Sequence, residues 1–575
     1  MGKNHLSELE AIRDQILAGR GKIPCDLVLK NGYVIDVFTG DIHLADIAIK
    51  GDRIVGVEKG YEGNNTIDLT GFYIAPGFID AHFHIESTML LPSVLSKYLL
   101  MNGTTCVVSD PHEIANVMGI TGILGIMKDA ENAVVDFYFT APSCVPATAL
   151  ETSGSSITAM QLSVFSKEAK IIGLSEVMDV LAVINGEISM LKKLLMFKTR
   201  HGHAPTLAGK DLMAYLSAGI DSDHETISYR EGLLKLRAGM FLMIREGSTA
   251  KNLEELLPLV SHSTYMRTCF VSDDLDPVDL YKEGHLNRIL RKAVDLGLDP
   301  ITAIRLVTIS PATYLGLGER LGIAPGKIAD MVILEDLKEF RVKAVVKSGR
   351  FMDIDSLKST LISSPSVNYL KKSINLGDIS LERLKIKAKG KTIRVIEIIP
   401  NQIITRQMVV EVSVKDGYVV PDISRDIVKL VVVERHRGSG NIGIGFVKGF
   451  GLRKGALATT ISHDSHNIVC VGTKDEDILA AILRLKELGG GIVVVNGRIL
   501  AELPLPYGGL MTDMIIENLV DTLKNLHASA KECGCELSLP FMTLSFLALP
   551  VIPYLKLTDK GLVEVLEGKI VDIFV

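Results

Sequence analysis

Between residues 73 and 273 the sequence repeats one pattern eight times, a short apolar run followed by a segment with helical periodicity. This alternation is typical of β/α units around a parallel sheet. With the helical segment after the last run, the repeats cover about 240 residues, the usual size of a closed (β/α)8 barrel, and a doubly wound open sheet is the alternative. We therefore predict an α/β fold centred on a barrel. The apolar runs occupy residues 73–82, 104–110, 135–142, 171–176, 197–203, 219–224, 240–246 and 267–273.

The chain is too long for a barrel alone, because its 575 residues exceed the roughly 250–300 at which a single core stops growing. Residues 25–60 alternate apolar and polar positions between turn signals, which predicts antiparallel strands, and two later runs at 329–335 and 342–349 could complete the same small sheet. Further alternating runs and a helix at 475–487 predict a separate α+β domain. The expected division is 1–72 for an N-terminal helix and the first part of a small β domain, 73–318 for the barrel, 319–360 for the second part of the β domain, and 361–575 for the C-terminal domain.

Composition excludes several classes of protein. The net charge of −6 lacks the basic excess of a nucleic-acid footprint, so a small ligand is the better expectation. No stretch of about 18 uncharged apolar residues occurs, and the polar opening segment lacks the apolar run of a signal peptide. The seven cysteines are scattered, unlike a disulfide framework. These features predict a cytoplasmic protein without a nucleic-acid or membrane partner.

The ends of the apolar runs carry the chemistry, because active sites of barrels lie at the C-terminal ends of the strands. Five of the eight runs end in side chains that bind metals. His82 and His84 stand two residues apart in a strand, so both can point to one face. Four imidazoles and two carboxylates on one rim can hold two divalent ions with a carboxylate between them. The set is His82, His84, Glu176, His203, His224 and Asp273.

Each of these residues has a structural alternative when taken alone. Glu176 would suit the N-terminus of the following helix, where the helix dipole favours an acid, and Asp273 could be an N-cap. Asp274 should point to the opposite side from Asp273, so only one of the two can face inward. His201 and His203 share a face, and spacing does not choose between them. We prefer His203 because it lies nearer the end of its run.

The motifs at these positions are similar to those of a known superfamily. PGFIDAHFH at 76–84, the terminal Asp273 and IAPGKIADMVIL at 323–334 resemble the amidohydrolases, which are metal-dependent barrel hydrolases. Within that superfamily, GFIDAHFHIESTML, VVSDPHEIANVMG, GHAP, SDHE, FVSDDL and ISHDSHN resemble the adenine deaminase family over essentially the whole chain. The resemblance implies hydrolysis of adenine to hypoxanthine and ammonia in purine salvage. It also implies a binuclear centre of manganese or iron on the six residues named above, although such ligands accept zinc as well.

One feature separates this family from its relatives. Many binuclear amidohydrolases bridge their metals with a carboxylated lysine at the end of the fourth strand, but no lysine lies between Lys170 and Lys192. Glu176 supplies a carboxylate there directly, which disfavours the alternative of an enzyme for cyclic amides or a related nucleobase. The filled ligand set disfavours a non-catalytic scaffold. The expected mechanism is attack on C6 by a hydroxide shared between the ions, with Asp273 moving a proton to the departing ammonia.

Further polar residues are candidates for contact with the purine. Glu113 and His112 in DPHE could protonate a ring nitrogen, or could instead cap the helix that follows. Apart from Asp110, each remaining candidate also has an ordinary role, as a rim ion pair, a helix cap or a hydrogen-bonded turn. The segment 462–467 could instead be a second metal site or help to close the active site. These candidates are Asp110, Arg245, Glu246, His285, His463 and His466. The apolar run at 541–555 suits a core or a subunit interface, and we expect a homo-oligomer, a dimer or larger.

Overall fold

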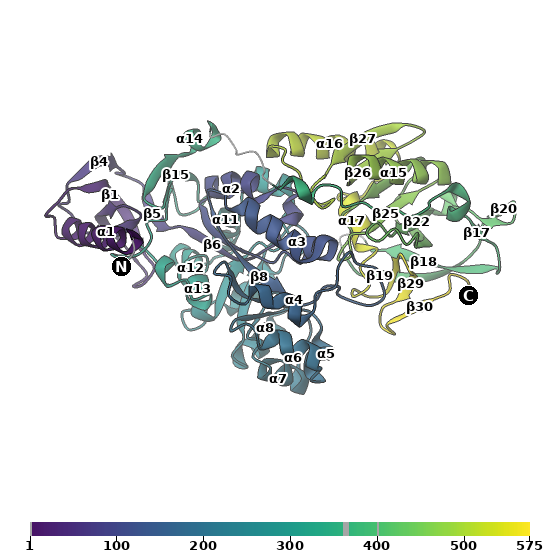
Figure 1. The fold of residues 1–575 in the computed structure, drawn as a ribbon, viewed down its shortest axis with the longest axis horizontal. Helices are drawn as coiled ribbons and strands as arrows, with labels where there is room; N and C mark the ends of the chain where they lie inside the picture. Colours follow the sequence, from purple (N-terminus) through teal and green to yellow (C-terminus); the bar gives the residue numbers. More distant parts are fainter. Residues whose placement is uncertain (1–2, 360–366, 400–401) are drawn as a thin grey trace.

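The computed structural model describes residues 3–359, 367–399 and 402–575. Figure 1 shows three bodies along one axis, with a small β domain at the N-terminal end, a barrel in the middle and a β-rich C-terminal domain at the other end. The predicted fold class, a (β/α)8 barrel with a flanking β domain and a C-terminal α+β domain, is confirmed.

The barrel strands follow one another in sequence order and pair in parallel. A parallel bridge from Phe83 to Asp273 joins the first strand region to the last and closes the ring. Most strand residues are buried, as expected for a parallel sheet covered on both faces. Each predicted run overlaps one barrel strand, and two of the strands extend one residue beyond their runs. The strands are β6 Phe78–Phe83, β7 Thr104–Ser109, β8 Asp136–Pro142, β9 Ile171–Val177, β10 Arg200–Gly202, β11 Ser222–Asp223, β12 Phe241–Arg245 and β13 Thr268–Val271.

The first predicted run requires a correction, because residues 73–82 contain parts of two sheets. Strand β5, Tyr73–Pro76, pairs with strands of the small β domain, and the barrel begins only at β6. Gly77 lies at the crossing point, where an added Cβ would come within 2.2 Å of Thr105 Oγ1. Apolar residues continue on both sides because both strands are buried, and the Pro76-Gly77 dipeptide is the sequence signal of the break.

The small β domain combines strands from both sides of the barrel in one eight-stranded sheet. Its central strand β1 pairs antiparallel with β2 and parallel with β4 and β5, and β5 pairs antiparallel with β14. Helix α1, Lys3–Gly19, precedes the sheet. The strands are β1 Cys25–Asp36, β2 Asp41–Lys50, β3 Arg53–Val57, β4 Gly63–Asp68, β5, β14 Met331–Leu334, β15 Val342–Lys347 and β16 Arg350–Asp353.

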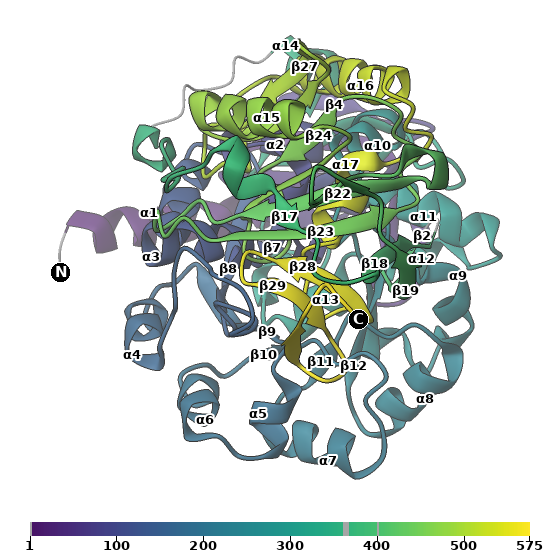
Figure 2. The same cartoon turned by 90° about the vertical axis from the view of Figure 1, so that its right-hand side faces the viewer.

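The C-terminal domain is built on a second eight-stranded sheet in the order β19-β18-β23-β22-β25-β24-β26-β27. Alternate residues of β26 divide the two faces: Val493 and Val495 pack with helix α15, Asp475–Leu488, whereas Ile492 and Val494 share a cluster with α16, Ile516–Glu532. Figure 2 shows both helices beside this sheet. The strands are β18 Thr392–Ile398, β19 Thr405–Glu411, β22 Ile427–Val433, β23 Ile442–Lys448, β24 Ala456–Thr459, β25 Ile468–Gly472, β26 Gly491–Val495 and β27 Ile499–Pro504.

The face of this sheet that carries α16 packs against the barrel. The two bodies share one apolar cluster. The backbone N–H of Thr512 donates to Met89 O at 2.8 Å, and Leu91 N–H donates to Thr512 O at 3.2 Å. Farther along, Asn467 Nδ2 donates to Thr152 O at 2.9 Å. The C-terminal domain therefore lies against the loops that follow the barrel strands.

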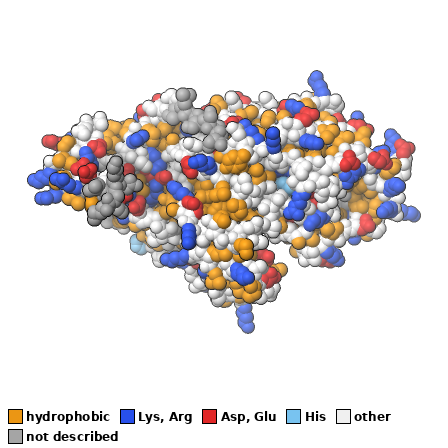
Figure 3. Space-filling model, viewed as in Figure 1, with side chains coloured by type: hydrophobic (Ala, Val, Ile, Leu, Met, Phe, Trp, Pro, Cys, Tyr) orange, Lys and Arg blue, Asp and Glu red, His pale blue; other side chains and the backbone are white. Residues whose placement is uncertain are grey.

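The surface gives two further facts. Lysine and arginine side chains are scattered among acidic ones on the face drawn in Figure 3. Within the described ranges, none of the helices combines the length and apolar character needed to cross a membrane.

Candidate metal centre at the barrel rim

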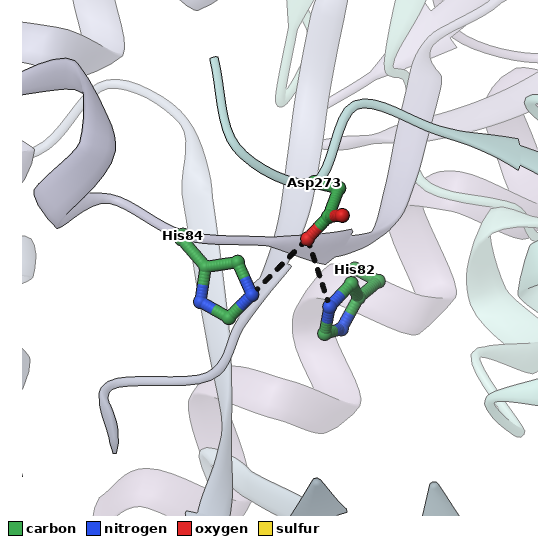
Figure 4. Close-up of side chains that lie close together, drawn as sticks. All are labelled: His82, His84 and Asp273. Atoms are coloured by element: carbon green, nitrogen blue, oxygen red, sulfur yellow. Dashed lines mark ion pairs between the residues drawn. The ribbon is translucent and has the colours of Figure 1, made fainter. Parts of the chain in front are cut away.

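The six residues predicted from the strand ends converge at one rim of the barrel. His82 lies on β6 and His84 follows it, and Figure 4 shows both rings turned toward Asp273. The Nε2 atoms of His82 and His84 are 3.4 and 3.2 Å from Asp273 Oδ1. Two imidazoles and one carboxylate therefore face a common point.

Glu176, on β9, lies between two pairs of imidazoles. Its Oε1 atom is 3.2 Å from His82 Nε2 and 3.0 Å from His84 Nε2. Its Oε2 atom is 2.6 Å from His203 Nδ1 and 3.5 Å from His224 Nε2. Because each oxygen serves a different pair, this carboxylate has the position needed to be shared by two ions.

Asp273 divides its two oxygens in a similar way. It lies just beyond β13 with φ of 56°, in the left-handed region that Asp tolerates better than most residues. Its N–H donates to His82 O at 3.1 Å, which fixes the end of the last strand beside the first. Oδ1 faces the two imidazoles, and Oδ2 accepts a hydrogen bond from Arg245 Nη1 at 2.9 Å.

Burial and the close charged partners determine the pKa values of the carboxylates and imidazoles at the rim. Burial opposes ionisation of Glu176, but the positive charge of His224 and the hydrogen bond from His203 hold the carboxyl pKa well below its usual value. Burial alone would lower the pKa of His82, but hydrogen bonds to Asp273 and Glu176 raise it to about 9. Metal binding needs neutral imidazoles, so an entering ion would displace protons here.

The residues fit divalent ions in both number and chemistry. His82 Nε2 is buried and lies 3.2 Å from Glu176 Oε1 and 3.4 Å from Asp273 Oδ1, so it is directed at the point where an ion would replace its proton. One trio of ligand atoms comes from His82, His84 and Asp273, and a second from His203, His224 and Glu225. In each trio the ligand atoms lie within 4.8 Å of one another. Imidazole and carboxylate ligands suit zinc, iron and manganese alike.

The structure distinguishes His203 from His201. His203 lies just beyond β10 and faces Glu176. His201 is inside the barrel, 3.5 Å from Ser222 Oγ and edge-on to the ring of Tyr314. Burial lowers the pKa of His201 to about 3, so this imidazole is neutral. Only His203 among the two reaches the central carboxylate.

Glu225 belongs to the same cluster and was not singled out from the sequence. Its Oε1 atom is 3.6 Å from His224 Nε2 and 3.8 Å from His203 Nδ1, and it forms an ion pair with Arg245. Strict strand alternation would turn Glu225 away from His224. Strand β11 ends at Asp223, however, so the alternation no longer applies. The SDHE motif at 222–225, in which Glu225 follows a predicted ligand directly, is the sequence feature that could have identified it.

Asp110 and His112 form a second group beside the centre. Asp110 Oδ2 accepts the N–H of Glu176 at 3.1 Å and lies 3.2 Å from His112 Nδ1. The His112 ring stands edge-on to that of His84, with centroids 4.9 Å apart. Asp110 therefore orients two neighbours of the centre.

Two residues predicted to contact the purine have their polar partners outside the rim cluster. Glu246 is buried with Oε1 2.6 Å from Lys292 Nζ, and Arg245 pairs with Glu225 and Asp273 instead of with Glu246. His285 is fully buried below the rim, 3.2 Å from Asp80 Oδ2 and 2.8 Å from Thr104 Oγ1. Its side chain caps no helix. The sequence placed these residues near strand ends but gave no direction for their side chains.

The histidines of the C-terminal domain lie against the barrel. His463 Nδ1 is 3.2 Å from Glu113 Oε1, and His466 Nε2 is 3.8 Å from Glu113 Oε2. Burial opposes ionisation of Glu113, but the positive charge of His463 outweighs it and lowers the carboxyl pKa. The same contact raises the pKa of His463 to about 9 against the effect of burial. The turn at 462–467 thus meets the DPHE segment of the barrel.

Comparison with known proteins agrees with this architecture. The amidohydrolase family model matches residues 73–352, so the fold and the rim define a metal-dependent hydrolase of the amidohydrolase class. The adenine deaminase C-terminal domain model matches residues 402–569. The chain is 44% identical over 569 residues to an adenine deaminase of Desulfatibacillum aliphaticivorans, covering 98% of this chain and 100% of that protein. It belongs to the adenine deaminase family.

Other relatives match over the same extent. Adenine deaminase 2 of Carboxydothermus hydrogenoformans is 44% identical over 570 residues, with 98% of this chain and 100% of that protein covered. An adenine deaminase of Methanothrix thermoacetophila is 42% identical over 568 residues, with 98% and 99% covered. The similarity therefore includes both the barrel and the C-terminal domain.

Proposed function

We propose that this protein hydrolyses adenine to hypoxanthine and ammonia at the barrel rim, as a metal-dependent hydrolase of C–N bonds. The observation that carries the proposal is the position of Glu176, whose two oxygens face separate pairs of imidazoles. Identity of 44% to adenine deaminases over 98% of the chain supports adenine as the substrate.

Two divalent ions, manganese or iron, would be held on either side of Glu176. His82, His84 and Asp273 face one side of this carboxylate, and His203 and His224 face the other. When bound, such ions would lower the pKa of a water molecule from 15.7 toward about 7 and so supply a nucleophile at neutral pH.

Asp273 is the proposed proton carrier. The exocyclic nitrogen of adenine must gain a proton before it can leave as ammonia, and the attacking water must lose one. Asp273 would accept the proton from water and deliver it to that nitrogen, a role worth typically about 10²–10⁴-fold in rate. The hydrogen bond from Arg245 to Oδ2 fixes the orientation of this carboxylate, which leaves Oδ1 directed at the centre.

His112 and Glu113 are proposed to manage the proton on a ring nitrogen. Burial would lower the pKa of His112, but the charge of Asp110 raises it well above its usual value, so this imidazole is available as a cationic donor. Glu113 is held ionised by His463 and can accept an N–H of the base. The two residues are adjacent at the start of α3, His112–Ala130, beside the proposed ligand His84.

We further propose a homo-oligomer that works in the cytosol. All seven cysteines are free and buried, in agreement with a reducing compartment. Large apolar side chains are exposed on the lobe between β8 and β11, among them Met160, Leu181 and Leu195 at 83%, 67% and 81% exposure. Contact between subunits would remove such groups from water.

Metal removal tests the activity. Treatment with a chelator should abolish ammonia release from adenine, and added manganese should restore it. Guanine and dihydrouracil, assayed in parallel, should release no ammonia and remain unchanged. Activity that is indifferent to metal would contradict the mechanism, and turnover of dihydrouracil in place of adenine would contradict the substrate.

A further inference from the structure

An apolar pocket lies between the barrel rim and the C-terminal domain. Its polar lining includes Ser87, Glu113 and Asp274 of the barrel and His463, and its apolar lining includes Met542 and Phe546 of the C-terminal domain. We call this space the interdomain pocket.

The polar end of the interdomain pocket adjoins the metal centre. Asp274 follows the proposed ligand Asp273 directly and accepts a hydrogen bond from Ser87 Oγ at 2.5 Å. Glu113 follows His112, whose ring contacts that of His84. A molecule in the pocket would therefore have one edge beside the carboxylates and the reacting centre.

The apolar end is formed by one helix of the C-terminal domain. Helix α17, Pro540–Phe546, places Met542 and Phe546 four residues apart and so on one face. Both side chains are only half-buried, while Phe541 and Leu544 on the same helix are buried. The ring of His463 stacks on Phe546 with centroids 4.8 Å apart and planes at 19°. The result is a flat surface that leads from α17 to Glu113.

We propose that the C-terminal domain forms one wall of the nucleobase site, with Phe546 and Met542 against the face of the base and His463 as the residue that positions Glu113. A purine base has two apolar faces and an edge of N–H donors, which complement this wall and the carboxylates of Glu113 and Asp274. The inference rests on the proposed function, since it names where that substrate binds.

Kinetics of two substitutions test the wall. Phe546→Leu should raise KM for adenine by roughly 5- to 100-fold, the range expected when aromatic stacking on a base is lost. It should leave kcat within threefold and the metal content unchanged. Phe450→Leu is the matched control, because Phe450 is buried in the same domain but does not line the pocket. An unchanged KM in Phe546→Leu would overturn the proposal.

The positioning role of His463 has its own readout. His463→Ala should lower kcat at least tenfold with the metal content retained, because Glu113 loses its partner. His463→Asn keeps an N–H donor at the position of Nδ1, so it should recover much of this loss. Equal losses in the two variants would reject the positioning role.

Photolabelling locates the base without using turnover. The holoenzyme is irradiated with 8-azidoadenine, and the labelled peptides are identified by mass spectrometry. We expect label on residues 459–466 or 540–546 that excess adenine prevents. Competable label confined to barrel peptides, or no competable label, would refute the wall. If the wall were labelled but adenine released no ammonia, the proposed function would be wrong and the proposed binding site would stand. If the enzyme released ammonia from adenine but was labelled elsewhere, the proposed wall would be wrong and the proposed function would stand.

Discussion

At the scale of single residues, Glu176 determines what the rim can hold. Four imidazoles around one buried point would repel one another if all were charged, and buried charges are tolerated only when they are paired. Glu176 and Asp273 supply two negative charges, and both carboxyl pKa values are held well below their usual range. The two carboxylates therefore offset part of the charge on the protonated imidazoles, and divalent cations can take the place of the bound protons.

His201 and His203 allow a matched test of the proposed ligand set. His203→Gln should reduce the bound metal from two ions toward one, because the ring nearest Glu176 Oε2 is lost. His201→Gln should keep both ions, since His201 faces Ser222 and Tyr314 instead. Metal content of the purified variants measures the difference. Loss of metal in His201→Gln alone would reverse the assignment.

Asp273→Asn separates proton transfer from metal binding. The amide oxygen can still face His82 and His84, so metal content should be retained, but an amide cannot carry the proton. We expect kcat to fall by several decades. Asp299→Asn serves as control, because this exposed side chain caps helix α12, Pro300–Arg305, and does not belong to the cluster at the rim. A threefold loss in Asp273→Asn would assign the proton transfer to another group.

How much of the site the sequence could predict depended on where each residue stands relative to a strand end. His82, Glu176 and Asp273 lie in or beside regular strands, where position and alternation give both the rim and the direction. Glu225 and His285 lie outside such strands, so their direction depended on loop geometry that no pattern describes. The contact of His463 with Glu113 joins two domains and could not be read from either segment.

At the scale of secondary structure, the sequence predicts where strands and helices occur better than it predicts which sheet each strand joins and which face packs against a neighbour. Strands β10 and β11 are very short, yet their runs were identified because the barrel repeat fixed where strands should occur. The crossing from β5 to β6 falls at Pro76-Gly77, a turn signal that the buried apolar residues on both sides outweigh in the pattern. The strands of the C-terminal domain were expected, but nothing local indicated which face of their sheet meets the barrel.

Strand β28, Leu555–Thr558, contains a lysine whose ionisation should affect stability. Lys556 is buried, and burial lowers its pKa from 10.5 to about 7. Its Nζ donates to Ile403 O at 2.8 Å and to Phe546 O at 2.9 Å. Between pH 7 and 10.5 the unfolded chain binds a proton that the folded chain lacks, so stability should rise with pH across this window.

Lys556→Met should remove that pH dependence. We expect the difference in unfolding free energy between wild type and variant to shift in favour of wild type by up to about 1.4 kcal/mol per pH unit from pH 7 to 10.5. Urea unfolding followed by circular dichroism measures the shift. The exposed Lys560, changed to Met, should give a curve parallel to wild type. Parallel curves for Lys556→Met as well would show that the buried amine keeps an ordinary pKa.

At the scale of the whole molecule, the barrel and the C-terminal domain share their core. A single apolar cluster contains Leu90 and Ile114 of the barrel together with Leu510 and Leu519 of the C-terminal domain. One face of the small β domain has a cluster of its own around Ile47, and its other face shares a second cluster with the barrel. The body that holds the proposed metal centre and the body that supplies the proposed pocket wall should therefore unfold together.

Hydrogen exchange of the full chain can test this coupling. Ligands that bind only the folded state stabilise every part that unfolds with the site, by about 2.7 kcal/mol when the ligand is at 100 times its Kd. Removing metal should therefore speed exchange by roughly 100-fold in the most protected amides of both β9 and β22. Strand β2, in the separate cluster, should change less. Faster exchange in β9 with β22 unchanged would show two independent units.

Tyr98→Phe should weaken the coupling without altering the metal centre. Tyr98 Oη donates to Glu517 Oε2 at 2.8 Å and accepts the N–H of Ile516 at 3.3 Å, so one hydroxyl ties the barrel to the first turn of α16. The variant leaves the Ile516 N–H buried without this acceptor, while the exposed Glu517 can turn to water, so the cost should be about 1 kcal/mol. In the variant, metal removal should therefore speed exchange in β22 by a smaller factor than in β9, whereas in wild type the two factors should be similar. An exchange pattern identical to wild type would place the coupling in the shared apolar cluster rather than in this contact.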